Sequence, residues 1–401
     1  MFLAVAASGC AGYPERAGRA LAQYRAGALD EAATSFESGD VTDSAFLSGA
    51  EVGMIRLSAG EWEAARDALT RAAEAARDAE EKSLLSVSEG AESVGTLLVN
   101  DTVAAYTGEG YERVLVHAAL AIAYLALGDV SGMRVETRRA NQVLEGEEAL
   151  YETKYGAGGL GHLLSAVSYE MERRLDEALI DYRRMVEKGV GLEIAGPRLR
   201  ELADFFGRDD VAELVADYEP AVSTDEPYAT VWVLGAMGLA PQKVERSLNL
   251  PTPVGFVRMT APDYVSSGGA RTLTLVLPDA GESVACTVVE DVDAVSRENL
   301  SDRLAWIAAR TAVRAGIRAG VHEYVEKEHG ALAAFGVDVL GLALERADLR
   351  SWLTLPREWQ AARAVLPPGG PHPRTDHLRR RQRPTRSLRT GGRRDHADLR
   401  A

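Results

Sequence analysis

The segment Gly27-Ala28-Leu29-Asp30-Glu31-Ala32 decides the fold class, because its pattern recurs along the first half of the chain. Each copy has a turn residue, an apolar or aromatic residue two positions on and a small residue five positions on. Further copies, some of them degenerate, begin at Gly60, Gly128, Arg173 and Gly207. Such a glycine turns the chain between two antiparallel helices, and the alanine lets these helices approach closely. We therefore predict paired helices across residues 14–220.

The spacing of these copies indicates a repeat architecture. The successive gaps are 33, 68, 45 and 34 residues, and tetratricopeptide repeats have a period of about 34 residues. Two gaps match this period and one is twice as long, so the segment resembles a tetratricopeptide-like α-solenoid. An irregular helical bundle is the alternative. A solenoid implies a concave groove that binds a partner protein or peptide.

The longest gap, from Gly60 to Gly128, is twice the repeat period, but the turn expected at its middle is missing. The segment 97–113 occupies that place. Polar and glycine residues break the helical period there. One interpretation is an exposed recognition loop on the concave face, with the candidate interaction residues Asn100, Asp101, Tyr106, Gly108, Tyr111 and Glu112. The alternative, which we favour, is that the tyrosines fill the interior of the solenoid and that Asn100-Asp101 caps the following helix.

The second half differs in character, and we predict a smaller α+β domain over residues 225–369. Residues 230–234 have the apolar, β-branched composition of a strand. The alternating segment 271–277 and the segment 284–289 flank a Pro-Asp-Ala-Gly-Glu turn, which predicts an antiparallel pair. Cys286 lies in the second of these strands and is expected to be a small buried residue.

One long helix is predicted over residues 291–327. Four arginines fall on one face of this helix, namely Arg303, Arg310, Arg314 and Arg318. We favour a solvated face whose arginines pair with local glutamates. The alternative is a surface that binds an anionic polymer or lipid.

Three strings carry a resemblance to a known family: residues 100–112, residues 238–243 and residues 345–356. Together they resemble a family of bacterial envelope lipoproteins that have tetratricopeptide-like helices at the amino end and an α+β part at the carboxy end. The resemblance implies no enzyme activity, because none is established for that family. Its most specific element comprises Asp348, Arg350, Ser351, Trp352, Leu355 and Pro356. We expect Trp352 and Leu355 to be buried anchors, and Asp348 and Arg350 to form an ion pair that fixes a loop.

The amino end, residues 1–13, resembles the lipobox of a truncated signal peptide. Apolar and small residues lead into Cys10, whose thiol would receive a diacylglycerol and anchor the chain on a membrane. Two features depart from that pattern: Ala7 stands where Leu is commoner, and no Lys or Arg precedes Arg16. We therefore expect the true start to lie further upstream. A chance apolar amino terminus is the alternative.

The other end of the chain has a different composition. Residues 370–401 hold ten arginines and no Phe, Tyr, Trp, Ile or Val, so this tail is predicted to be disordered. An amino-acid sequence rich in Arg, Pro, Gly and His is typical of GC-rich DNA translated out of frame. We therefore expect a frameshift near Gly369. The alternative is a genuine basic tail that binds anionic lipid or polymer.

Composition excludes several classes of function. The net charge of −15 over 401 residues argues against nucleic acid as a partner. Two cysteines cannot build a disulfide framework or a Cys-rich zinc site. The sequence contains no H-E-x-x-H, G-x-S-x-G, Walker or Cys/His metal-binding pattern. The string 156–161 fits G-x-G-x-x-G, but no strand pattern precedes it, so we interpret it as a flexible linker between repeats.

These features predict a non-catalytic, lipid-anchored scaffold with no cofactor, no metal and no catalytic residue. It would bind an envelope protein or peptide through the groove of its helical repeats and lie at the cell envelope, facing the periplasm. The first alternative is an envelope assembly factor that binds anionic polymer or lipid through the arginine face. The second is an enzyme that acts on the cell wall.

Overall fold

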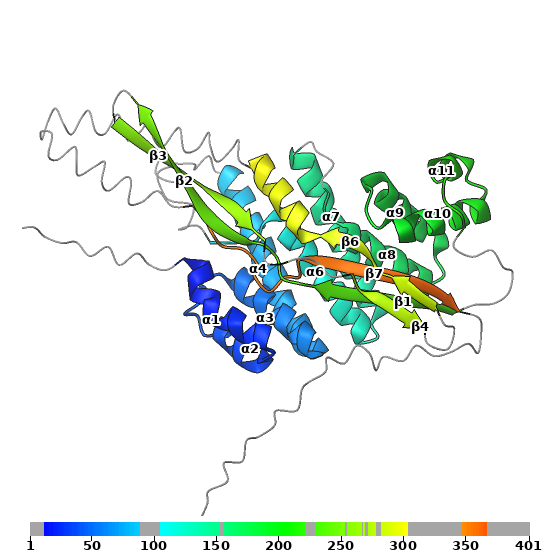
Figure 1. Ribbon diagram of the computed structural model, residues 1–401, viewed down its shortest axis with the longest axis horizontal. Helices are drawn as coiled ribbons and strands as arrows, with labels where there is room; N and C mark the ends of the chain where they lie inside the picture. The colour runs from blue at the N-terminus through cyan, green and yellow to red at the C-terminus, as the bar shows by residue number, and fades with distance from the viewer. Residues whose placement is uncertain are drawn as a thin grey trace, which may run out of the picture.

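The computed structural model describes residues 12–88, 105–151, 156–220, 229–252, 255–266, 268, 272–277, 282–303 and 347–366. Over these residues the chain is mostly helical, with a smaller part that contains sheets (Figure 1). The predictions for Cys10, Asn100, Asp101, Arg310, Arg314, Arg318 and the tail after Gly369 lie outside the described residues.

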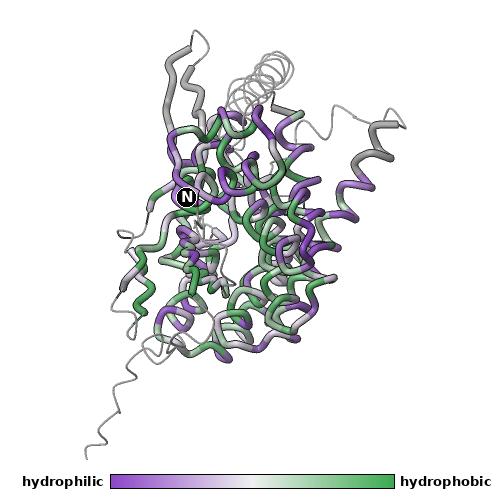
Figure 2. Tube along the Cα trace, turned by 90° about the vertical axis from the view of Figure 1, so that its right-hand side faces the viewer, coloured by the Kyte–Doolittle hydropathy of each residue, from purple (hydrophilic) through white to green (hydrophobic). Residues whose placement is uncertain are grey.

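The helices follow one another as pairs joined by short turns (Figure 1). The pairs are α1 (Tyr13–Ala26) with α2 (Leu29–Glu37), α3 (Ala45–Ala59) with α4 (Trp62–Ser88), α6 (Gly110–Ala126) with α7 (Val130–Tyr151), α8 (Gly159–Met171) with α9 (Leu175–Lys188), and α10 (Leu192–Phe206) with α11 (Asp209–Leu214). In Figure 2 hydrophilic and apolar residues alternate along these helices, as expected where each helix buries one face.

All five predicted turns lie between the two helices of a pair, so these predictions are confirmed. The backbone φ is 80° at Gly27, 78° at Gly60 and Gly128, 61° at Arg173 and 64° at Gly207. A residue in this left-handed conformation ends a helix by turning its backbone N–H groups back onto the last carbonyls, and glycine adopts it without steric cost. Arg173 is the one non-glycine residue with such a φ in the described part of the chain.

The strands within the described ranges form three small antiparallel units. A three-stranded sheet has the order β1 (Ala229–Met237), β7 (Glu358–Leu366) and β6 (Thr287–Asp291), while β2 (Gln242–Thr252) pairs with β3 (Gly255–Val265), and β4 (Thr274–Leu277) pairs with β5 (Glu282–Ala285). The predicted strand at 230–234 is therefore confirmed. The predicted pair is confirmed only in part: β4 pairs with β5, but the predicted second strand, 284–289, is interrupted at Cys286, and its residues from 287 on belong to β6, which pairs with β7. Cys286 is buried but lies just after β5, and the helix predicted from residue 291 begins at 292 and extends through 303 within the described residues.

A continuous apolar core connects the helical pairs with the sheet part. It contains Phe46 and Leu47 of α3 and Leu115 of α6, together with Trp352 and Leu355 of the segment that precedes β7. The first helix of a pair faces this segment or the sheet in four successive pairs: α3 and α6 bind residues 352–354, α8 binds β6, and α10 contacts the start of β6. In Figure 1 the segment and β7 run across the helices as the orange ribbon.

Candidate functional site

A short loop before α6 carries the candidate interaction residues that the structure describes. Gly108 has a φ of 87°, and a side chain there would collide with the ring of Phe46. Glu109 caps α6, and the backbone N–H of Glu109 donates to Glu112 Oε2 over 3.0 Å, which completes a capping box. This geometry turns Tyr106, Tyr111 and Glu112 towards the sheet part.

Glu112 is fully buried and accepts four hydrogen bonds. Its partners are the hydroxyls of Tyr106 (2.6 Å) and Tyr111 (3.2 Å) and the backbone N–H groups of Glu109 (3.0 Å) and Trp352 (2.7 Å). Burial raises the pKa of Glu112, while Lys243 and the donors lower it again. All four donors come from this chain, so the carboxylate is used to hold the fold together.

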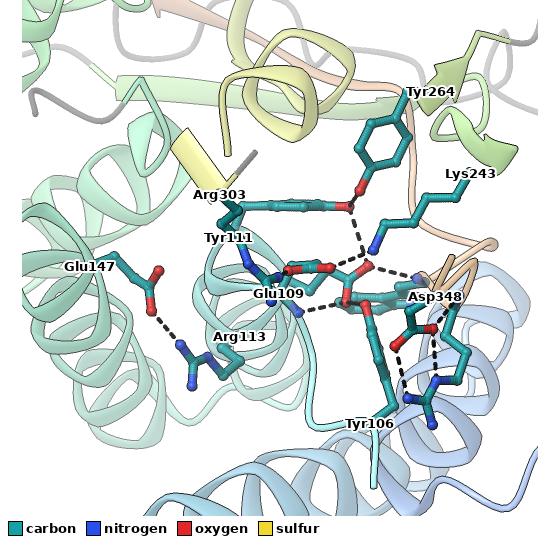
Figure 3. A network of polar contacts seen from close by, with 12 residues as sticks. Tyr106, Glu109, Tyr111, Arg113, Glu147, Lys243, Tyr264, Arg303 and Asp348 are labelled. Atoms are coloured by element: carbon teal, nitrogen blue, oxygen red, sulfur yellow. Dashed lines mark hydrogen bonds and ion pairs between the residues drawn. The ribbon is translucent and has the colours of Figure 1, made fainter. Parts of the chain in front are cut away.

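Lys243 of β2 is buried next to this group (Figure 3). Its ammonium pairs with Glu109, which also pairs with Arg303, and it lies 5.8 Å from the ring centres of Tyr106 and Tyr264. The Tyr264 hydroxyl lies 3.2 Å from that of Tyr111. A buried ammonium needs both a carboxylate and close polarisable neighbours to offset its lost hydration, and here it has both.

The Asp348–Arg350 ion pair closes the cluster on the other side and confirms the predicted pairing. Arg350 Nη2 lies 2.8 Å from Asp348 Oδ2, and the guanidinium lies 5.2 Å from the ring centre of Tyr106. Figure 3 shows Asp348 beside Tyr106. We call Tyr106, Glu109, Tyr111, Glu112, Lys243, Tyr264, Asp348 and Arg350 the buried polar cluster.

A second buried carboxylate, Glu51 of α3, binds the next two residues of the same segment. It accepts hydrogen bonds from the backbone N–H groups of Leu353 (2.7 Å) and Thr354 (2.8 Å) and from the hydroxyl of Tyr13 (2.6 Å). Burial raises the pKa of Glu51 to about 7, and the hydrogen bonds limit that rise. Three consecutive backbone N–H groups, at residues 352–354, are thus held by carboxylates of two helices.

The glycine string at 156–161 binds a carboxylate of this chain. Glu290 of β6 accepts hydrogen bonds from the backbone N–H groups of Gly158 (3.1 Å) and Leu160 (3.0 Å) at the start of α8. Burial raises the pKa of Glu290 to about 7. A Cβ atom on Gly159 would collide with the carbonyl oxygen of Val289. The string is therefore a close contact between α8 and β6, and the interpretation as a flexible linker is wrong.

The structure brings the three strings of the family resemblance together in one place. Tyr106, Tyr111 and Glu112 meet Lys243 and the segment around Trp352 in the buried polar cluster and its neighbourhood. The tyrosines are 8% and 2% exposed, so the interpretation as an exposed recognition loop is wrong for them, and the favoured interpretation of buried tyrosines is confirmed. The cap expected from Asn100-Asp101 lies outside the described residues, and α6 is capped by Glu109. Ser351, Trp352, Leu355 and Pro356 are buried, which confirms the two expected anchors.

Several residues of this region escaped the sequence analysis. Glu51, Tyr264 and Glu290 were not singled out, and Lys243 was named only as part of the string 238–243, although each contributes a buried polar contact. A usable signal existed for Glu51, since it is the one acidic residue of α3, a helix in which apolar residues predominate. A single carboxylate inside an apolar helix must find partners in the fold.

Comparisons with family models, with curated proteins and with solved structures found no match to this chain. No group of His, Cys, Asp and Glu side chains within the described ranges could hold a metal ion. Of the helices that the structure describes, none has the length and apolar character needed to cross a membrane.

Proposed function

We propose that this chain is a non-catalytic scaffold, anchored by a lipid on Cys10 in a bacterial cell envelope, that holds a partner protein or peptide. The observation that carries the proposal is the use of the buried carboxylates. Glu51, Glu112 and Glu290 each accept backbone N–H groups of a distant segment. Such contacts lock the helical pairs and the sheet into one rigid framework, which is what a scaffold requires.

The helical pairs support a tetratricopeptide-like solenoid as the frame of this scaffold. Their turns recur at 27, 60, 128, 173 and 207, and solenoids of this kind present an extended surface to partners. The face made by the first helices α3, α6, α8 and α10 is covered by the chain's own sheet part. A partner must therefore bind where this cover leaves part of the surface open.

Exposed apolar side chains near the end of the helical region offer such a surface. Phe205 is 72% exposed and stacks edge to face with Phe206, and Leu214 of the next helix is 44% exposed. Exposed aromatic residues that lie together favour contact with another protein. By contrast, Arg303 pairs with Glu109 and is drawn into the buried polar cluster, which disfavours its use for binding a polymer.

Site-specific photo-crosslinking in intact envelopes tests this proposal. A photoreactive phenylalanine analogue replaces Phe205 in the full chain, and Val135, 47% exposed on α7, serves as the control position. We expect one partner, identified by mass spectrometry, to be captured from position 205 and not from 135, and F206E to abolish that capture. A Cys10→Ala variant should leave the membrane fraction. Equal labelling at both positions, or none at 205, would contradict the partner surface.

A further inference from the structure

One edge of strand β7 is paired with another strand over only part of its length. On one side β7 pairs with β1 from Glu358 to Leu366 along its whole length. On the other side it pairs with β6 only as far as Ala361. Residues 362–366 therefore have no strand on that side among the described elements. An unpaired strand edge presents backbone donors and acceptors that can pair with another chain.

The chain leaves this edge at Cys286, between β5 and β6. The Cys286 N–H donates to the carbonyl oxygen of Leu273 over 2.8 Å, and β5 pairs with β4 in place of β7. The hairpin of β4 and β5 packs through Leu277 against Ala364 and Leu366. The chain itself thus keeps its neighbouring strand off the edge of β7.

A groove follows this edge. It has a volume of about 410 Å³ and lies between α10, which contributes Ile194 and Pro197, and the hairpin, which contributes Leu277 and Val284. Residues 361–365 of β7 form its floor. Three of these five residues are alanines, so an extended backbone can approach β7 closely.

The orientation of the backbone favours strand addition at this place. The Val292 N–H donates to the carbonyl oxygen of Arg357, so the backbone groups of Arg357 point to the β6 side. Because these groups alternate in direction along a strand, those of Arg363 and Val365 point the same way, into the groove. They are the groups that an added strand would use.

Two charged side chains line the groove, Glu193 and Arg363, and the carboxylate of Glu193 already accepts a hydrogen bond from the Thr287 hydroxyl. The charge left for an added strand to match is therefore that of Arg363. Nε of Arg363 is buried and has no hydrogen-bond partner in the described part of the chain, and the guanidinium lies 6.0 Å from the ring centre of Trp232. A buried guanidinium is satisfied best by a carboxylate. A second copy of this chain fits poorly, since pairing β7 with β7 would bring two Arg363 side chains onto one short ladder.

We propose that the groove along residues 362–366 of β7 binds an extended segment of a partner protein, which adds as a strand to the sheet. The segment has small or apolar side chains at alternate positions and an Asp or Glu that pairs with Arg363. This inference rests on the proposed scaffold function and specifies the chemistry of one partner segment. It also separates this docking site from the exposed surface around Phe205.

A random dodecapeptide phage library panned on the purified full chain tests the site. We expect enriched peptides with an alternating apolar pattern and an acidic residue. R363E should weaken their binding about tenfold or more, and Val365→Pro, which removes an N–H from the open edge only, should weaken it as well. In hydrogen exchange, the amides of Arg363 and Val365 should exchange fast in the free chain and slowly with a peptide bound.

The proposal is overturned by any of three results. The first is a library that yields no binder, and the second is a set of peptides that bind R363E as tightly as the unchanged chain. The third is slow exchange of both amides in the free chain, which would mean that the edge is already paired. The hydrogen-exchange readout needs no substitution, so a misfolded variant cannot decide the outcome. Capture at position 205 in envelopes, together with any one of these three results, would leave the scaffold function standing while the β7 site falls.

Discussion

The carboxylate of Glu51 in α3 accepts a hydrogen bond of 2.7 Å from the backbone N–H of Leu353, which lies 302 positions further along the chain. The same carboxylate binds Thr354, and Glu112 of α6 binds Trp352. Residues 352–354, which lie outside the described strands, thus have their N–H groups bound by side chains of the helices. Buried backbone donors left without partners cost free energy, so the segment can lie buried against the helices only because these glutamates accept its N–H groups.

Glu51→Gln should lower the free energy of unfolding by about 1–3 kcal/mol. The amide has the shape of the carboxylate but replaces one acceptor oxygen by a donor, which would then face a backbone N–H or the Tyr13 hydroxyl. Urea titration followed by circular dichroism measures the loss. Glu37→Gln, an exposed change at the end of α2, is the matched control and should stay within about 0.5 kcal/mol of the unchanged chain. Equal stability of the two variants would refute the assigned role of Glu51.

Stability should fall as pH rises from about 5 to 8. Burial raises the pKa of Glu51 and of Glu290 from the usual value of 4.5 to about 7. Between these values the folded chain holds protons that the unfolded chain has released, so rising pH favours unfolding. The full effect is at most about 3 kcal/mol for each carboxyl group. Thermal unfolding across this range checks the sign, and a melting temperature that rises with pH would contradict it.

The double variant Glu51→Gln, Glu290→Gln tests whether these two carboxyl groups, and not other groups of the chain, produce the pH dependence of stability. Neither amide titrates, so the pH dependence between 5 and 8 should flatten in this variant even though its stability is lower throughout. Burial also raises the pKa of Glu112, which leaves a residual slope of the same sign. An unchanged slope would show that other groups produce the pH dependence.

Gly159→Ala should destabilise the chain, because the added methyl group would collide with the backbone carbonyl of Val289 in β6. Backbone atoms cannot move aside as a flexible side chain can, so we expect a loss of about 1–3 kcal/mol. Gly146→Ala is the matched control, since it lies within α7 and its new methyl group meets nothing within 4 Å. That change should stabilise the helix by about 0.5–1 kcal/mol. Equal effects of the two substitutions would argue against the close contact of α8 with β6.

The local features of this fold were predictable from the sequence, because turn chemistry depends on a few neighbouring residues. The turns at Gly27, Gly60 and Gly207 follow from a glycine between two amphipathic runs. The ion pair of Asp348 with Arg350 spans two positions and is local in the same way. The anchors Trp352 and Leu355 were predictable because large apolar side chains are usually buried.

The remaining features depend on partners that are distant in the sequence. Strands β2 and β3 contain Pro251 and Pro262, and proline within a run argues against a strand unless the strand lies at an edge. Strand β7 is rich in alanine and forms through its pairing with β1, more than a hundred positions earlier. The burial of Tyr106 and Tyr111 also depends on Glu112 and on strands far along the chain, so a local pattern could not decide it.

Native-state hydrogen exchange at Trp352, Leu353 and Thr354 tests the central claim most directly, namely that the helical pairs and the sheet part unfold as one framework. The three amides are bound by Glu112 and Glu51. We predict that they exchange only through global unfolding, with the same opening free energy as the most protected amides of α3. The claim would be contradicted if the three amides exchanged through a local opening whose free energy is several kcal/mol lower than that of the most protected amides of α3.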